Sequence, residues 1–124
     1  MKPYFLAALI LVGASAAAAH EVEKGPNGGQ LVDIPGHHVE LVISGTSLVL
    51  FLSDEKERPV SSQGIQNARA IVQESGKTLT VPLASIAPNK LSGQLAQPLT
   101  AGARILVSAS MVDGKTIQAR FVRR

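Results

Sequence analysis

NARAIVQESGKTLTVPL, residues 67–83, is the stretch that decides the fold class. Two runs rich in β-branched and aliphatic residues flank Ser75-Gly76, a pair typical of a hairpin turn. Residues 78–81 alternate between polar and apolar side chains, which is the period of a half-buried strand. The Ile-Val pair at 71–72 and the following turn disfavour a helix. The stretch therefore predicts two antiparallel strands joined by a tight turn.

Short strands and turn signals continue along the rest of the chain. Further turns are predicted at Ser44-Gly45-Thr46 and at Asp113-Gly114, where both residues tolerate positive φ. No sustained helical periodicity is present after residue 19. The predicted strands are residues 30–33, 38–44, 47–53, 67–74, 77–83, 90–95, 103–111 and 115–122. Seven or eight short antiparallel strands in about 100 residues predict an all-β fold, a small antiparallel β-sandwich or a small barrel.

The first residues have the three-part layout of a secretory signal peptide. Lys2 gives a positive start, residues 6–12 are apolar, and small residues lead to Ala17-Ala18-Ala19. The apolar run is too short to span a bilayer, and no later segment is long and apolar enough to do so. The expected organisation is a signal helix at 1–19 cleaved before His20, an extended lead-in at 20–36 and the β-sandwich at 37–124. We expect a soluble periplasmic protein without membrane insertion; a membrane anchor or a buried N-terminal helix is the alternative.

The composition excludes several function classes. The chain has no Cys, and after residue 19 its only aromatic residues are Phe51 and Phe121. A disulfide framework, a Cys-type zinc site and a thiol nucleophile are therefore excluded. Because aromatic side chains for base stacking are missing, no nucleic-acid partner is expected. No Gly-x-Ser-x-Gly elbow is present and no histidine follows His38, so the chain is not expected to be an enzyme.

Charge is divided unevenly along the exported part of the chain. Residues 20–57 hold 7 acidic and 2 basic side chains, whereas residues 58–124 hold 9 basic and 2 acidic ones. Such a division can orient a protein against a partner or favour a cation in the acidic part. The alternative is that the charges interleave in space once the chain is folded.

All three histidines lie within 19 residues, at His20, His37 and His38. Imidazole nitrogen and carboxylate oxygen are ligands that divalent ions such as Cu(II) and Zn(II) prefer, and Met111 is the only soft ligand. On a strand, His38 and Glu40 leave the same face, so they form the predicted pair of ligands, with His37 reaching back from the turn. If cleavage falls before His20, its α-amine and imidazole chelate an ion together. A solvated or hydrogen-bonded His-x-Glu pair and a disordered N-terminal histidine are the alternatives.

Two stretches carry a family resemblance: residues 25–32, GPNGGQLV, and residues 38–42, HVELV. They resemble a pattern found in small periplasmic proteins associated with heavy-metal efflux systems, and in the N-terminal extra domain of some metal-efflux periplasmic adaptor subunits. Further similar segments are 48–54, 59–60 with Gly64, 79–83, 89–93 and 114–121. The resemblance implies a periplasmic β-sandwich that binds or hands over a transition-metal ion, with His38 and Glu40 carried over. Asn27 stands where many relatives have His, and His20 is what remains of a preceding His-rich run, so potential ligands are lost.

Two functions follow from these observations. The first is a periplasmic copper- or zinc-class binding accessory protein or carrier linked to heavy-metal efflux or resistance, with a metal-efflux adaptor as partner. Its predicted metal ligands are His38, Glu40, His37 and His20. The second is a metal-free interaction module that docks on an envelope or efflux complex by an edge strand or by its charge. Converging histidines would favour the first, and scattered histidines with an exposed apolar or basic patch the second. An enzyme with an N-terminal-histidine copper centre is disfavoured by the shortage of aromatic residues.

Overall fold

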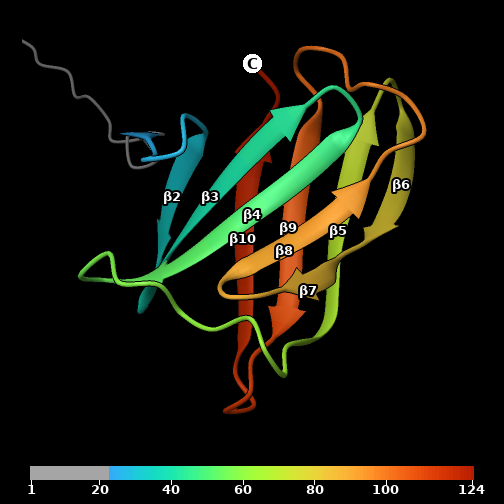
Figure 1. Cartoon of the computed structure of the whole chain (residues 1–124). Helices are drawn as coiled ribbons and strands as arrows, with labels where there is room; N and C mark the ends of the chain where they lie inside the picture. Colours follow the sequence, from blue (N-terminus) through green and yellow to red (C-terminus); the bar gives the residue numbers. More distant parts are fainter. Residues whose placement is uncertain (1–22) are drawn as a thin grey trace, which may run out of the picture.

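The computed structural model describes residues 23–124, in which all regular structure is β-strand. Two antiparallel sheets stack face to face, one with the strand order β1-β2-β3-β4-β8-β7 and the other with the order β10-β9-β5-β6 (Figure 1). The predicted all-β sandwich is confirmed. The signal helix at 1–19 and His20 lie outside the described residues. Within residues 23–124, no helix is long and apolar enough to cross a membrane.

Ten strands make up the two sheets. They are β1 (Glu23–Lys24), β2 (Gln30–Ile34), β3 (His37–Ser44), β4 (Ser47–Asp54), β5 (Gln66–Glu74), β6 (Lys77–Pro82), β7 (Ala84–Ile86), β8 (Lys90–Gln94), β9 (Arg104–Ser110) and β10 (Thr116–Val122). Each of the eight predicted strands is present, with ends within one residue of the prediction. The sequence did not reveal β1 and β7, because two or three residues are too few to show alternation. Both β1 and β2 belong to the six-stranded sheet, so the lead-in joins the sandwich from Glu23 onward.

The core lies between the sheets and is built from alternate residues of each strand. In β4, Leu48, Leu50 and Leu52 are fully buried, while Val49 and Phe51 between them are half-buried on the outer face. This partial cover of the outer face explains why residues 48–52 of β4 are all apolar. The four-stranded sheet contributes Ala70, Val72, Val81, Ile105, Val107, Ala109, Ile117, Ala119 and Phe121.

The two long sides of the sandwich differ. On one side the chain passes from the four-stranded to the six-stranded sheet at Leu83, whose N–H donates to the carbonyl of Ala68. That crossing, from β6 to β7, closes the side covalently. On the other side β2 lies beside β10 without forming a ladder, although Gln30 Nε2 donates to the carbonyl of Val122 at 2.6 Å. This second side is held by contacts alone.

The charge is divided unevenly between the two sheets. The acidic part of the chain forms β1 to β4 of the six-stranded sheet, whereas the basic part supplies β7 and β8 of that sheet and all four strands of the other. Because side chains alternate along a strand, Arg69, Arg104 and Arg120 lie on the face turned away from the core, and all three are exposed. The alternative of interleaved charges therefore does not apply to this face.

Truncation of Leu50 tests the position of the core. Leu50 is fully buried, whereas Leu79 on the edge strand β6 is 49% exposed. Leu50→Ala is expected to lower the free energy of unfolding by about 2–5 kcal/mol, because it removes buried area and leaves a cavity. The matched change Leu79→Ala should cost less than about 1 kcal/mol. Urea unfolding measures both, and equal losses would contradict this core.

Candidate metal centre

The β2–β3 hairpin brings an imidazole and a carboxylate together. Pro35-Gly36 forms its two-residue turn, in which Gly36 takes the positive φ of 81° that such a turn requires. This turn pairs Asp33 with His38 across the two strands. The Nε2 atom of His38 lies 3.3 Å from Oδ1 of Asp33, and the two side chains are 18% and 72% exposed. An ion from solvent can therefore reach the carboxylate and the imidazole from the same side.

The second histidine of the hairpin points elsewhere. Successive side chains of a strand leave opposite faces, so His37 and His38 cannot both face one ion without distorting β3. In the register of the sheet, His37 lies opposite Ile34 on one side and Asp54 on the other. The side chains of His37 and His38 therefore lie on opposite faces of β3.

Asp54 is held by the loop that follows β4. Its carboxylate accepts hydrogen bonds from the N–H groups of Lys56 and Arg58, and Nε of Arg58 lies 2.9 Å from Oδ2. The backbone N–H of Arg58 is the largest influence that lowers the pKa of Asp54, and the N–H of Lys56 and the guanidinium of Arg58 add to it. Asp54 therefore has its partners in its own loop.

The carboxylate of Glu40 has a structural partner. Glu40 is 1% exposed, and both its oxygens face the turn of residues 25–29. The backbone N–H of Asn27 lies 2.9 Å from Oε2, its side-chain Nδ2 lies 2.9 Å from Oε1, and the N–H of Gly29 lies 2.7 Å from Oε2. These donors satisfy a charge that would otherwise be costly to bury. Glu40 thus fastens the N-terminal turn to the outer face of the six-stranded sheet.

The glycine-rich turn is shaped by the same contact. A Cβ atom at Gly25 would lie 2.2 Å from Cδ of Glu40, so only glycine allows the turn to pack this closely. The turn closes on itself, because Gly25 N–H donates to the carbonyl of Gly29 and Gly28 N–H to that of Gly25. The two stretches that carried the family resemblance, residues 25–32 and 38–42, are therefore one structural unit.

The predicted ligands occupy different environments. His38 and Glu40 share a face, as their spacing predicts, but the oxygens of Glu40 are bound by the turn, and His37 lies on the opposite face. His20 lies outside the described residues. Among residues 23–124, no group of three or more His, Asp or Glu side chains is placed to hold an ion. What the fold does bring together is His38 with Asp33.

Asp33 was not singled out from the sequence. The signal for it was Pro35-Gly36: a two-residue turn at this point fixes the register and sets Asp33 opposite His38. The orientation of His38 adds to the case, because its Nδ1 is buried without a hydrogen-bond partner among the described residues. Nε2 is therefore the nitrogen that an ion would meet.

No protein-family model matches the chain, and no match was found among curated proteins or among solved structures. Function is therefore inferred from the geometry of this chain and from the resemblance of its two N-terminal stretches.

Removal of the Glu40 charge tests its role in the turn. Glu40→Gln replaces one of the two acceptor oxygens with an amide donor, so that one of the buried donors of Asn27 and Gly29 loses its acceptor. We expect a loss of about 1–3 kcal/mol in the free energy of unfolding. Glu55→Gln, in an exposed loop, is the matched control and should change it by less than about 0.5 kcal/mol. If Glu40→Gln lowers only metal affinity and leaves stability unchanged, Glu40 is a ligand and not a support of the turn.

The pKa of Asp54 gives a pH prediction. Because its pKa is lowered in the folded protein, the loop interaction stabilises the fold above the unfolded-state pKa and is lost as the pH falls through the lower folded-state value. An NMR titration should place the Asp54 carboxyl midpoint below 3.8. Arg58→Ala should raise that midpoint, since it removes the guanidinium. A wild-type midpoint at or above 3.8 would contradict the observed hydrogen bonds.

Proposed function

We propose that this chain is an exported accessory protein that binds and carries a divalent transition-metal ion, Cu(II) or Zn(II), in heavy-metal efflux or resistance. The observation that carries the proposal is the 3.3 Å approach of His38 Nε2 to the carboxylate of Asp33 on an accessible part of the six-stranded sheet. One imidazole and one carboxylate are a donor set that both ions accept. The periplasmic location and the link to efflux are supported by the signal-like N-terminus and by the family resemblance.

An incomplete donor set suits a carrier. Two protein ligands leave the remaining coordination positions to water or to a partner, as in zinc sites that keep an open position. An ion held in this way exchanges readily, because ligands of a partner can bind it before His38 and Asp33 dissociate from it. His20 is predicted to add its α-amine and imidazole; it stands three residues before β1.

The ligand role predicted for Glu40 passes to Asp33 in this proposal. Glu40 could bind an ion only by giving up the N–H groups of Asn27 and Gly29, and the turn would lose its attachment. Asp33 is 72% exposed. Within residues 23–124, its carboxylate has one side-chain partner, the Nε2 atom of His38. The exchange of one carboxylate for another keeps the chemistry of the site and moves it to the surface.

A second candidate function is the metal-free interaction module that docks on an envelope or efflux complex. Two observations favour it. His37 and His38 lie on opposite faces of β3, and the outer face of the four-stranded sheet carries exposed arginines. The two functions are compatible, because the hairpin with His38 belongs to one sheet and the arginines to the other.

Calorimetric titration with Cu(II) and with Zn(II) tests the metal site. The protein is purified from the exported fraction, and its intact mass fixes the N-terminal residue. We expect stoichiometric binding that weakens by at least about tenfold in His38→Ala and is also reduced in Asp33→Asn, since each removes one donor. His37→Ala is the matched control and should retain the wild-type affinity within about twofold.

Two results would overturn the metal proposal. One is the absence of binding heat with either ion. The other is a His38→Ala variant that binds as tightly as the wild-type protein while remaining folded by circular dichroism. In either case the second candidate function stands alone.

A further inference from the structure

The outer edge of β10 pairs with no strand among residues 23–124. β10 is the terminal strand of its sheet and pairs with β9 on one side. In an antiparallel pair the backbone groups of alternate residues point to opposite sides. Arg123 directs its N–H and its carbonyl to the β9 side, so Gln118, Arg120 and Val122 direct theirs to the free edge. The carbonyl of Val122 confirms this direction, since it accepts a hydrogen bond from Gln30 of β2.

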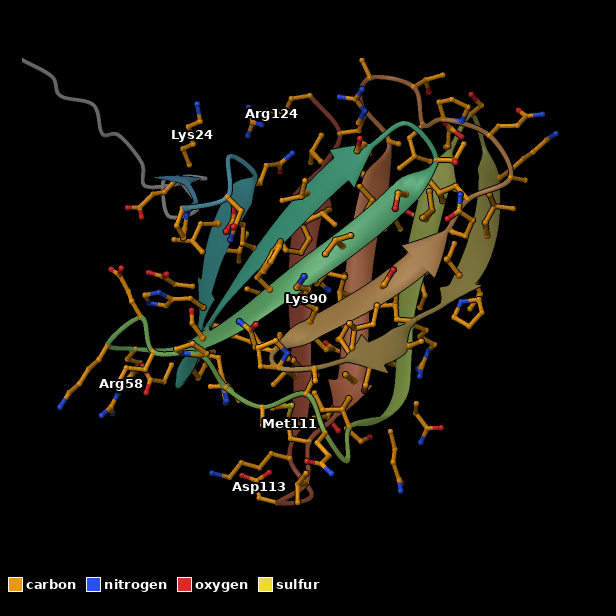
Figure 2. All side chains as sticks on the ribbon, in the orientation of Figure 1. Lys24, Arg58, Lys90, Met111, Asp113 and Arg124 are labelled. Carbon is orange, nitrogen blue, oxygen red and sulfur yellow. The ribbon has the colours of Figure 1, made fainter. Side chains whose placement is uncertain are left out.

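A groove of about 1100 Å³ runs beside this edge. Residues of β1 and β2 line it on one side, and residues of β10, β9 and β5 line it on the other. Val32 and Ile34 line the β2 side; they are partly buried and pack against the core. Arg124, which follows β10, also lines the groove (Figure 2). Strand edge and groove therefore coincide.

The outward face next to the edge carries positive charge around an apolar pair. Arg120 lies opposite Leu106, and Leu106 lies opposite Ile71; both aliphatic side chains are half-buried. Arg104 and Arg69 stand two residues before Leu106 and Ile71, on the same face. The strand register places no Asp or Glu on this face within residues 23–124. Nor does any of the three arginines form an ion pair with a described carboxylate.

Glu23 of β1 and Asp33 of β2 are the acidic residues that line the groove, and neither forms an ion pair with an arginine in residues 23–124. Asp33 lines the groove, yet its carboxylate is turned to His38 on the outer face of the six-stranded sheet. Val32 and Ile34, on either side of it, leave β2 on the opposite face and so toward the core side. The groove is thus apolar where Val32 and Ile34 line it and basic where Arg104, Arg120 and Arg124 line it.

We propose that an extended segment of a partner protein, with alternating acidic and apolar residues, adds as a strand to the free edge of β10. Its backbone pairs with Gln118 and Arg120. Its acidic side chains face Arg120, Arg104 and Arg124, and its apolar side chains fill the groove against Val32 and Ile34. A strand has side chains on two faces with a period of two, and this site is basic on one face and apolar on the other.

The geometry favours a peptide over a lipid surface. A bilayer presents a broad, level layer of headgroups and has no backbone donors or acceptors to pair with a strand edge. The site here is a groove that ends in a strand edge, and its charge stands on one side of that groove. Edge strands that remain free are the usual points of strand addition.

The inference rests on the second candidate function and is independent of the metal. His38, on the outer face of the six-stranded sheet, is not among the residues that line the groove, so His38→Ala should leave peptide binding unchanged. Loss of metal binding and loss of peptide binding are therefore separate results.

Peptide binding to the protein purified from the exported fraction tests the site. The probe is a fluorescent peptide of about eight residues in which Glu and Val alternate. A second peptide has the same composition with its Glu residues grouped at one end, and a third carries N-methyl groups on alternate amides. We expect the first to bind and the other two to bind at least about tenfold more weakly, since one loses the period and the other the backbone hydrogen bonds. Equal binding of the first two would overturn strand addition.

Charge reversal locates the site. Arg120→Glu and Arg104→Glu should each weaken binding of the alternating peptide by at least about tenfold, with normal circular dichroism. Lys90→Glu is the matched control and should change it by less than about twofold, because Lys90 lies over the outer face of the six-stranded sheet with its Nζ 5.6 Å from the centre of the Phe51 ring (Figure 2). Arginine variants that bind like the wild type would overturn the assignment of this face.

Three further results would overturn the proposal in favour of another occupant. They are binding to phosphatidylglycerol vesicles without binding to the peptide, self-association that Arg120→Glu abolishes, and failure of every peptide to bind. Cross-linking in intact cells reports on docking itself. If the Arg120→Glu variant keeps the wild-type cross-links, the proposed docking function stands, but its assignment to the edge of β10 is overturned.

Discussion

The buried carboxylate of Glu40 is the interaction on which the N-terminal part of the fold depends. A charge at 1% exposure is stable only when its oxygens are hydrogen-bonded, and the N–H groups of Asn27 and Gly29 supply those bonds. This contact fixes the turn of residues 25–29 on the sheet, and β1 and β2, which flank the turn, take their places from it. The candidate ion site and one wall of the groove both lie on β2. Each proposal therefore needs this one carboxylate to stay hydrogen-bonded to the turn.

Much of the fold could be predicted from local pattern, and much less of the site. Alternation and turn residues placed eight strands to within one residue, because each signal lies inside a short stretch of chain. The spacing of His38 and Glu40 predicted their common face but not that the Glu40 oxygens were already bound by a turn that lies 11–13 residues earlier. To predict Asp33 as a ligand, the register of the β2–β3 hairpin had to be known. The arginine face needed three strands that come together only in the folded sheet.

The two sides of the sandwich differ, and this difference determines where a partner strand can bind. At Leu83 the chain itself joins the sheets, so that side is closed by a covalent link between the edge strands β6 and β7. Beside β10 the sheets are joined by side-chain contacts, among them the exposed hydrogen bond from Gln30 Nε2 to the carbonyl of Val122. Such open edges promote aggregation unless charge protects them. The arginines beside β10 serve both needs, since they repel a second copy of the same edge and attract a segment of opposite charge.

The division of charge between the sheets gives the molecule an electric dipole across the thickness of the sandwich. A dipole of this kind exerts a torque on the protein while a charged partner is still beyond contact, so the approach is oriented before any side chain touches. The basic sheet would turn toward an acidic partner, and the sheet that bears His38 would turn toward a cation. Dissolved salt screens this orienting field beyond a Debye length, about 8 Å at physiological ionic strength. The dipole would therefore raise the rate of encounter more than the strength of the final complex.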